Sequence, residues 1–446
     1  MNTTQINQEL FTFIQNSPSP YHAVASAASM LESHGFQPLR EQDAWALEYG
    51  GRYYVTRNQS SLAAFCLPEA AHAGNPSFHI IASHSDSPSF KLKENGEMTV
   101  ENRYTRLNVE RYGGSILAPW FHRPLSLAGR VLTEENGHIE SRLVNLDQDL
   151  AMIVNLAIHM NRGINDGYKY SIQTDMLPLI GGCQPPVSVR AMAASSLNLA
   201  ESAILTMDLF LYNRMEGRIW GASREFIGAP RLDDLQCAFA SFRAISGQVH
   251  PDLIPMAVMF DNEEVGSQSR QGACSTFLKD VMRRISLSLN LTEEGYLRAL
   301  SRSFMVSADN GHALHPNYPA KSDPGNHPYL NGGVMIKYAA NQKYTSDGIS
   351  SAIFRAICRQ EQIPTQVFFN HSDVPGGSTL GNLSASQISI PSVDIGAPLL
   401  GMHSPYETGG AEDTLSLVAA MEAFLKTRIE YEGEQSFRLL PMEKSR

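Results

Sequence analysis

The first part of the chain begins with a helical pattern of apolar positions and then changes to a pattern typical of strands. Leu10, Phe13 and Ile14 have the spacing of one helix face, which predicts a first helix. Two prolines in Ser17–Pro20 interrupt it, and a second helix is predicted from Tyr21 to His34. Apolar runs then predict four strands, at Trp45–Tyr49, Arg52–Thr56, Leu62–Leu67 and Phe78–Ser83. Gly50-Gly51 predicts a hairpin turn between the first two strands.

The pattern changes between residues 93 and 219, where short strand-like runs alternate with turns. Gly129–Thr133 and His138–Val144 flank the turn Glu135-Asn136-Gly137, which predicts a β-hairpin. In this region only Leu150–Met160 has the apolar spacing of a helix. We therefore expect residues 93–219 to form a β-rich domain, inserted into a larger domain made of residues 1–92 and 220–446.

Strands and helices alternate regularly in the remainder of the chain. Helices are predicted at Asp234–Ala244, Gln268–Leu289, Thr292–Ser301, Gly348–Glu361 and Asp413–Ile429. Apolar strands are predicted at Met256–Phe260, Phe304–Ala308, Val334–Lys337, Thr365–Phe369 and Ser389–Ile395. This alternation predicts an α/β fold, with a mixed, mainly parallel sheet flanked by helices. In such folds, functional residues gather in loops at the strand ends.

Composition excludes several classes of protein. The net charge of −10 disfavours nucleic acid and anionic membrane surfaces as partners. The five cysteines are scattered without a CxxC spacing, which disfavours disulfides and a thiolate zinc site. The sequence has neither a signal-peptide pattern at its start nor a run of about 18 apolar residues. We therefore expect a cytoplasmic protein that binds neither nucleic acid nor membrane.

The pair Glu263-Glu264 is the first candidate for chemistry, because it follows the apolar run Leu253–Phe260. Two carboxylates beside a core repel each other and lose hydration unless a positive charge neutralises them. A divalent metal could do so, with one glutamate as ligand and its neighbour as general base. Taken alone, the pair is more simply explained as a solvated acidic turn.

Four further sites contain metal-ligand residue types at predicted strand ends or in loops. In the His84-Ser85-Asp86 stretch, alternation along a strand points His84 and Asp86 to the same side, so one could ligate while the other orients it. Asp233 lies where a loop enters a helix and could bridge two metals, or simply cap that helix. Asp309 follows a strand, and His403 lies in a loop before the last helix. Two histidines with several carboxylates suit a pair of divalent ions, such as zinc, manganese or cobalt.

With these motifs in place, the chain resembles the aspartyl aminopeptidases of the M18 family, within the clan of dinuclear zinc aminopeptidases. The matching stretches are His84–Pro88, Asn155–His159, Pro230–Asp233, Asp261–Ser267, Ser307–Asp309, Gly311-His312, His315–Tyr318, Ile336-Lys337, Gln342–Tyr344 and Met402–Ser404. The resemblance implies an aminopeptidase that removes N-terminal Asp or Glu from peptides. It also implies a homododecamer built from dimers that join through the inserted domain.

Residue by residue, the resemblance implies two zinc ions in each subunit. The first would bind His84, Asp233 and Asp309. The second would bind Asp233, Glu264 and His403, so that Asp233 bridges the two. If Asp234 were the bridge, this assignment would shift by one position, but Arg231-Leu232-Asp233 aligns better with Asp233. Glu263 would be the general base, and Asp86 would orient His84.

The resemblance also implies substrate contacts by His312, Lys337 and Tyr344. A cation such as Lys337 would suit an acidic N-terminal side chain, although a strand-end lysine in solvent is the simpler interpretation of this residue alone. His159 is implied to reach the active site of a neighbouring subunit, with a metal ligand as the alternative. By its pattern alone, His159 would be a partly buried histidine beside a helical apolar stripe.

Two other functions fit parts of the same pattern. The predicted ligands could equally serve a dinuclear zinc N-acyl amino-acid deacylase, or an aminopeptidase of another specificity. A non-catalytic peptide-binding protein is disfavoured, because every predicted ligand and the base Glu263 are present.

Overall fold

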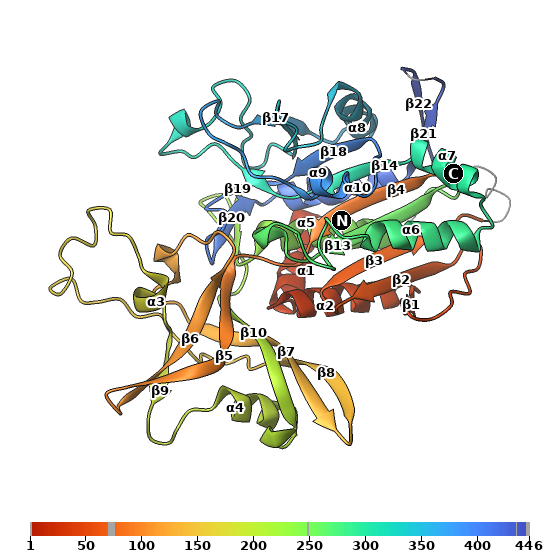
Figure 1. Ribbon diagram of the computed structural model, residues 1–446. Helices are drawn as coiled ribbons and strands as arrows, with labels where there is room; N and C mark the ends of the chain where they lie inside the picture. The colour runs from red at the N-terminus through yellow and green to blue at the C-terminus, as the bar shows by residue number, and fades with distance from the viewer. Residues whose placement is uncertain (1, 70–75, 248, 434, 443–446) are drawn as a thin grey trace.

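In the computed structural model, which describes residues 2–69, 76–247, 249–433 and 435–442, the chain forms a nine-stranded sheet with helices on both faces and a separate six-stranded sheet (Figure 1). The strand order of the large sheet is β1-β2-β3-β13-β4-β14-β18-β16-β17. These strands are β1 Gln37–Leu39, β2 Arg52–Arg57, β3 Ser61–Cys66, β4 Phe78–His84, β13 Ile254–Phe260, β14 Phe304–Ala308, β16 Val334–Tyr338, β17 Thr365–Phe369 and β18 Ser392–Gly396.

The large sheet is mixed and mainly parallel. Strand β4 runs parallel to both β13 and β14, and the pairs β1/β2, β14/β18 and β16/β17 are also parallel. The pairs β2/β3, β3/β13 and β16/β18 are antiparallel. The predicted α/β fold, with a mixed, mainly parallel sheet flanked by helices, is confirmed.

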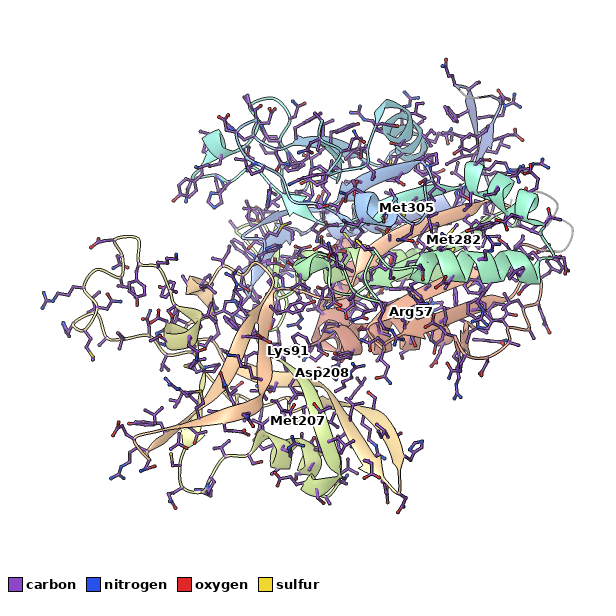
Figure 2. All side chains as sticks on the ribbon, viewed as in Figure 1. Arg57, Lys91, Met207, Asp208, Met282 and Met305 are labelled. Carbon is purple, nitrogen blue, oxygen red and sulfur yellow. The ribbon has the colours of Figure 1, made fainter. Side chains whose placement is uncertain are left out.

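Strand β13 shows why this sheet is covered on both faces. All seven of its residues are buried, as expected for an apolar run in the centre of a sheet. Ala257 and Met259 pack into the core on one face, and Met256 and Val258 into the core on the other. The helices of the first face are α1 Thr3–Gln15, α2 Pro20–Glu32, α5 Leu232–Ser246, α8 Gly348–Gln360 and α10 Asp413–Leu425. The helices of the second face are α6 Phe277–Ser288, α7 Glu293–Ser301 and α9 Leu380–Ser384. Met282 of α6 and Met305 of β14 are buried in the core on this second face (Figure 2).

The six-stranded sheet, with the strand order β8-β7-β10-β5-β6-β9, lies between β4 and α5 in the sequence and has a core of its own. Its strands are β5 Ser89–Val100, β6 Tyr104–Tyr112, β7 Leu125–Glu135, β8 His138–Asn145, β9 Leu179–Gly182 and β10 Ile204–Asn213, and its helices are α3 Ile172–Asp175 and α4 Val189–Ser196. We call it the inserted sheet. The predicted domain boundaries at residues 92 and 219 stay a prediction.

Charged and aromatic contacts fasten the inserted sheet to the large-sheet domain. Asp208 of β10 pairs with Lys91 of β5 at 2.8 Å (Figure 2). It also pairs with Arg130 of β7 at 3.1 Å. Arg130 also donates to the backbone oxygen of Asn58 at 2.8 Å, and its guanidinium lies 4.3 Å from the ring centroid of Tyr21 in α2. The inserted sheet is therefore held against both α2 and the β2–β3 turn.

Two smaller sheets complete the fold. The first has the order β11-β12-β20-β19-β15, and the second is the hairpin β21/β22. Their strands are β11 Arg218–Trp220, β12 Phe226–Ala229, β15 Gly311–His312, β19 Pro398–Leu400, β20 Glu407–Gly410, β21 Thr427–Tyr431 and β22 Phe437–Pro441. No helix within the described part of the chain is both long and apolar enough to cross a membrane. The expected cytoplasmic location stays a prediction.

Two predicted elements near the edges of the fold are wrong. Residues 45–49 form no strand, so the predicted hairpin at Gly50-Gly51 is absent from this described segment, and β2 pairs with β1 and β3 instead. Trp45 and Leu47 do pack on the core, but the backbone N–H of Glu48 donates to the side-chain hydroxyl of Tyr53 in β2 rather than to a backbone oxygen of a neighbouring strand. Leu150–Met160 is not a helix: Ala151 and Ile153 form isolated β-bridges, and the following residues form a loop with turns.

Two predicted helices are shorter than expected. The helix expected from Gln268 begins only at Phe277, because Ser269 and Gln271 fold back to hydrogen-bond Asn262. The last helix ends at Leu425 rather than at residue 429, since residues 427–431 pair with β22.

Candidate metal centre

The predicted ligands gather where three parallel strands end. His84 is the last residue of β4, and Asp309 follows β14 directly. The short helix η4, Glu263–Val265, begins three residues after the end of β13. Because β4 is parallel to both β13 and β14, their carboxyl ends lie at the same edge of the sheet.

The carboxylate of Asp233 lies in the middle of this cluster. Its Oδ1 is 3.7 Å from Nε2 of His84, and its Oδ2 is 3.2 Å from Nε2 of His403. Nε2 of His84 also lies 3.9 Å from Oδ1 of Asp309, and Nε2 of His403 lies 3.5 Å from Oε1 of Glu264. The fold therefore brings all five predicted ligands together, and Asp233 faces a histidine with each of its oxygens.

Both histidines are oriented by backbone carbonyl groups. Nδ1 of His84 donates to the backbone oxygen of Asp86 at 3.0 Å, and Nδ1 of His403 donates to that of Gly114 at 3.1 Å. A carbonyl oxygen only accepts, so Nδ1 must carry the proton in each ring. In the neutral ring this leaves the Nε2 lone pair facing the carboxylates, which is the arrangement of a metal-binding histidine.

Asp86 holds the backbone of both adjacent glutamates. It is fully buried, its Oδ1 accepts the backbone N–H of Glu263 at 3.1 Å, and its Oδ2 accepts that of Glu264 at 3.1 Å. Oδ1 also lies 3.4 Å from Nδ1 of His84. The contacts of Asp86 thus include η4 as well as the histidine it was predicted to orient.

The buried carboxylates of the cluster favour the binding of a cation. Oδ1 of Asp233 and Oε1 of Glu264 are buried without a hydrogen-bond partner. Burial, reinforced by neighbouring carboxylates, raises the pKa of Glu263 to about 8 and that of Glu264 well above its ordinary value. Burial alone would lower the pKa of His403, but Asp233 and Glu264 outweigh it and raise that pKa to about 10. The raised pKa values mean that Glu263 and Glu264 bind protons more readily when no metal neutralises the cluster.

The donor set and its spacing fit zinc. Tetrahedral zinc holds nitrogen and oxygen ligands at about 2.0–2.2 Å, so that two ligand atoms lie roughly 3.3–3.6 Å apart. The four pairs of nitrogen and oxygen atoms around Asp233 are 3.2–3.9 Å apart. Histidine nitrogen and carboxylate oxygen are both ordinary zinc ligands.

Asp234, the alternative bridge, faces the cluster differently. Its Oδ2 accepts the backbone N–H of His84 at 3.1 Å, and it can join His84, Asp233 and Asp309 in one group of ligand atoms. The group that contains His403 consists of Asp233, Glu264 and His403. Asp233 therefore belongs to both of these groups of ligand atoms, whereas Asp234 belongs to only one of them.

Glu407 is a buried residue of the site that the sequence did not single out. Its Oε2 accepts the backbone N–H of Asp233 at 3.0 Å, and its Oε1 accepts that of His403 at 2.7 Å. Burial and the charge of Asp233 raise its pKa to about 8. The one sequence signal is a glutamate four positions after His403, which by itself does not indicate a contact with two backbone groups.

The predicted substrate residues Lys337 and Tyr344 lie beside the cluster. Lys337 is buried, and its Nζ lies 3.6 Å from Oδ2 of Asp309. The Nζ donates to the backbone oxygen of Asn310 at 3.1 Å and lies 5.3 Å from the ring centroid of Tyr344. The simpler interpretation of Lys337 as a lysine in solvent is therefore wrong. Burial would lower its pKa, but Asp309 outweighs that effect and the pKa is raised, so the ammonium stays charged.

The other two predicted substrate residues occupy different positions. The ring centroid of His312 lies 6.3 Å from that of Phe368, which also packs on Tyr344. The side chain of His312 is exposed, but desolvation by the surrounding protein and the nearby Lys337 lower its pKa. His159 is exposed in a turn of the inserted region and is absent from the ligand groups found among the described residues. The interpretation of His159 as partly buried is wrong, and its predicted reach into a neighbouring subunit stays a prediction.

Comparison with known proteins identifies a matching family model and similar proteins. The family model "Aminopeptidase I zinc metalloprotease (M18)" matches residues 13–425. A "Probable M18 family aminopeptidase 2" of Clostridium novyi is 43% identical over 418 residues, covering 92% of this chain and 96% of that protein. Among solved structures, Ape4 in its complex with Nbr1 is similar with a TM-score of 0.89 at 35% identity, over 95% of this chain and 86% of that one. The mApe1 dodecamer of S. cerevisiae is similar with a TM-score of 0.82 at 28% identity, over 96% and 97% of the two chains.

Proposed function

Because the chain belongs to the M18 family of zinc aminopeptidases, we propose that it removes N-terminal Asp or Glu residues from peptides by means of two zinc ions. The observation that carries the dinuclear proposal is the position of Asp233, whose two oxygens face different histidines. One zinc would bind His84, Asp233 and Asp309. The other would bind Asp233, Glu264 and His403.

The zinc ions, when bound, would polarise the scissile carbonyl and lower the pKa of the attacking water. Glu263 would accept the proton from that water and pass it to the leaving amine, so that hydrolysis consumes one water and releases an amino acid and a shortened peptide. The chain holds Glu263 for this role through its backbone N–H, which donates to Asp86. Glu263 lies among the ligands but is outside the proposed ligand set, which leaves its carboxylate free to act as a base.

Selection of an acidic residue would rest on Lys337 and His312. Lys337 is a buried cation that makes one hydrogen bond, to a backbone oxygen, and one ion pair of 3.6 Å with Asp309. An ammonium has three N–H donors, so it can still bind a substrate carboxylate. His312 lies next to this charge and can add a donor, while Tyr344 and Phe368 supply the apolar wall.

We further propose that the chain assembles into a homododecamer from dimers joined through the inserted domain; the similar mApe1 of S. cerevisiae forms a dodecamer. The loop that carries His159 supports an interface here, because Leu156, Ile158 and Met160 are 53%, 49% and 74% exposed. Several exposed apolar residues in one short loop favour a protein contact. Light scattering of the purified protein should then give about twelve times the chain mass of 49.1 kDa, and a stable monomer would contradict this assembly.

Hydrolysis of matched aminoacyl amides tests the proposed specificity. We expect the zinc-loaded enzyme to release Asp and Glu faster than Leu or Lys from substrates with the same leaving group. A clear preference for Leu or Lys would refute selection of acidic residues. Faster cleavage of N-acetyl-Asp than of free Asp at the same position would instead select the deacylase reaction.

A further inference from the structure

The inserted sheet reaches the candidate metal centre through the end of strand β6. Tyr112 is the last residue of β6 and pairs with Ser89 of β5. Its ring packs edge-on against Phe210 of β10, with the ring centroids 5.4 Å apart. The side chain is thus anchored in the inserted sheet while its hydroxyl points to the large-sheet domain.

The hydroxyl of Tyr112 joins two groups on which the glutamate pair depends. It donates to Oδ2 of Asp86 at 2.7 Å and accepts from Nδ2 of Asn262 at 2.9 Å. Asp86 holds the backbone N–H groups of Glu263 and Glu264, and Asn262 is the residue immediately before them.

The direction of these hydrogen bonds follows from the surrounding network. The side-chain oxygen of Asn262 already accepts from Ser269 and Gln271, at 2.8 and 2.9 Å, so its amide nitrogen must be the atom that faces Tyr112. The single proton of the phenol is then free to point at Asp86. Burial together with Asp86 raises the pKa of Tyr112, so the phenol keeps that proton.

The two residues after Tyr112 contact the proposed second zinc site directly. At Gly113, which has a φ of +74°, a Cβ atom would lie 3.0 Å from Cβ of Glu264, so a larger residue would push that glutamate. Gly114 accepts the Nδ1 proton of His403, and Ile116 donates its N–H to the backbone oxygen of His403 at 3.0 Å. One turn of the inserted sheet therefore contacts Asp86, Glu264 and His403.

We propose that Tyr112 is a positioning residue of the active site: its hydroxyl fixes Asp86 and Asn262, and through them the placement of Glu263 and Glu264. The proposal rests on the zinc-dependent function proposed above. It makes the inserted sheet a structural part of the metal centre, in addition to any role in assembly. Among the described residues, the hydrogen bonds and ring contact of Tyr112 go to Asp86, Asn262 and Phe210, and so we expect it to affect turnover and zinc binding rather than substrate binding.

The variant Tyr112→Phe tests this proposal, because it removes only the hydroxyl. Groups that orient metal ligands typically contribute about 10- to 100-fold to activity or metal affinity. We expect kcat to fall about 10- to 100-fold on the best aminoacyl amide, with KM changed less than about threefold. In the metal-free protein, titration with zinc against a competing chelator should show an affinity about tenfold weaker or more.

Tyr54→Phe is the matched control. The hydroxyl of Tyr54 also donates to a carboxylate, that of Glu32, but this pair lies between β2 and α2. We expect Tyr54→Phe to keep the wild-type kcat and zinc affinity. A purely structural role of the Tyr112 hydroxyl would lower the melting temperature and leave both of these quantities unchanged.

A folded Tyr112→Phe variant whose kcat and zinc affinity stay within twofold of wild type would overturn the proposal. If Tyr112→Phe does not fold, Asn262→Gly decides, because glycine accepts the left-handed backbone of that position and removes the other partner of the phenol. Its zinc affinity should fall, and a wild-type affinity would overturn the proposal. The zinc titration needs no substrate, so an error in the proposed acidic specificity would not affect this outcome.

Discussion

Replacing Glu407 with glutamine tests how strongly the metal centre depends on a carboxylate that holds the backbone of two proposed ligands. Glutamine has nearly the same shape, but it offers one oxygen and one NH₂ group. One of the two backbone donors, from Asp233 at 3.0 Å or from His403 at 2.7 Å, would then face another donor.

The expected size of the effect follows from these two contacts. A buried backbone donor left unpaired costs about 1–3 kcal/mol, whichever of the two it is. Only one of the two contacts is lost, so we expect a penalty of about 1–3 kcal/mol. If that penalty falls on the placement of Asp233 and His403, zinc affinity and kcat/KM should each drop about 10- to 100-fold.

The assay is zinc titration of the metal-free protein, combined with kcat/KM on an Asp-linked amide. Glu422→Gln serves as the control, because the carboxylate of Glu422 in α10 is partly exposed and forms an ion pair of 2.9 Å with Lys426. We expect the control to change neither quantity. A Glu407→Gln variant that melts at a lower temperature but binds zinc and turns over normally would refute the reasoning.

Three further substitutions test separate parts of the structure. Glu263→Gln should lower kcat by about 10²–10⁴-fold and leave zinc affinity within about threefold, since Glu263 is the proposed base and not a ligand; normal turnover would remove it from that role. Lys337→Gln should lower kcat/KM for Asp-linked substrates about tenfold more than for Leu-linked ones; an equal loss on both would make Lys337 only the counter-charge of Asp309. His79 is fully buried against Phe424, and burial lowers its pKa to about 3, so the folded protein resists a proton that the unfolded chain accepts below about pH 6.5. Stability should therefore fall from pH 6.5 to pH 4, by up to roughly 3 kcal/mol more in wild type than in His79→Leu, and identical pH profiles in denaturant unfolding would contradict this.

The sequence predicted the strands that carry the metal centre because each of them is strongly apolar and ends at a polar residue. The run Ile254–Phe260 is buried throughout, and His84 and Asp309 lie at the ends of two other buried strands. Parallel pairing then places these ends together. The order of ligand residue types along the chain therefore indicated one site at these strand ends, whereas the ligands assigned to each metal ion came from the resemblance to the M18 family.

Contacts between residues that lie far apart in the sequence could not be predicted from the sequence. Tyr112 and Asp86 are 26 positions apart, and Glu407 and Asp233 are 174 apart, without any local pattern that links them. The false helix at 150–160 has a similar cause. Ile153 is buried in the core of the inserted sheet, whereas Ile158 is 49% exposed, so the helical spacing of these apolar residues does not reflect one buried face.

The most direct test of the dinuclear centre is a crystal structure of the zinc-loaded protein, with anomalous scattering measured on both sides of the zinc absorption edge. We expect two zinc peaks. The first should contact His84 and Asp309, the second should contact Glu264 and His403, and the carboxylate of Asp233 should contact both. A single peak, or two peaks bridged by Asp234 instead of Asp233, would contradict the proposed centre.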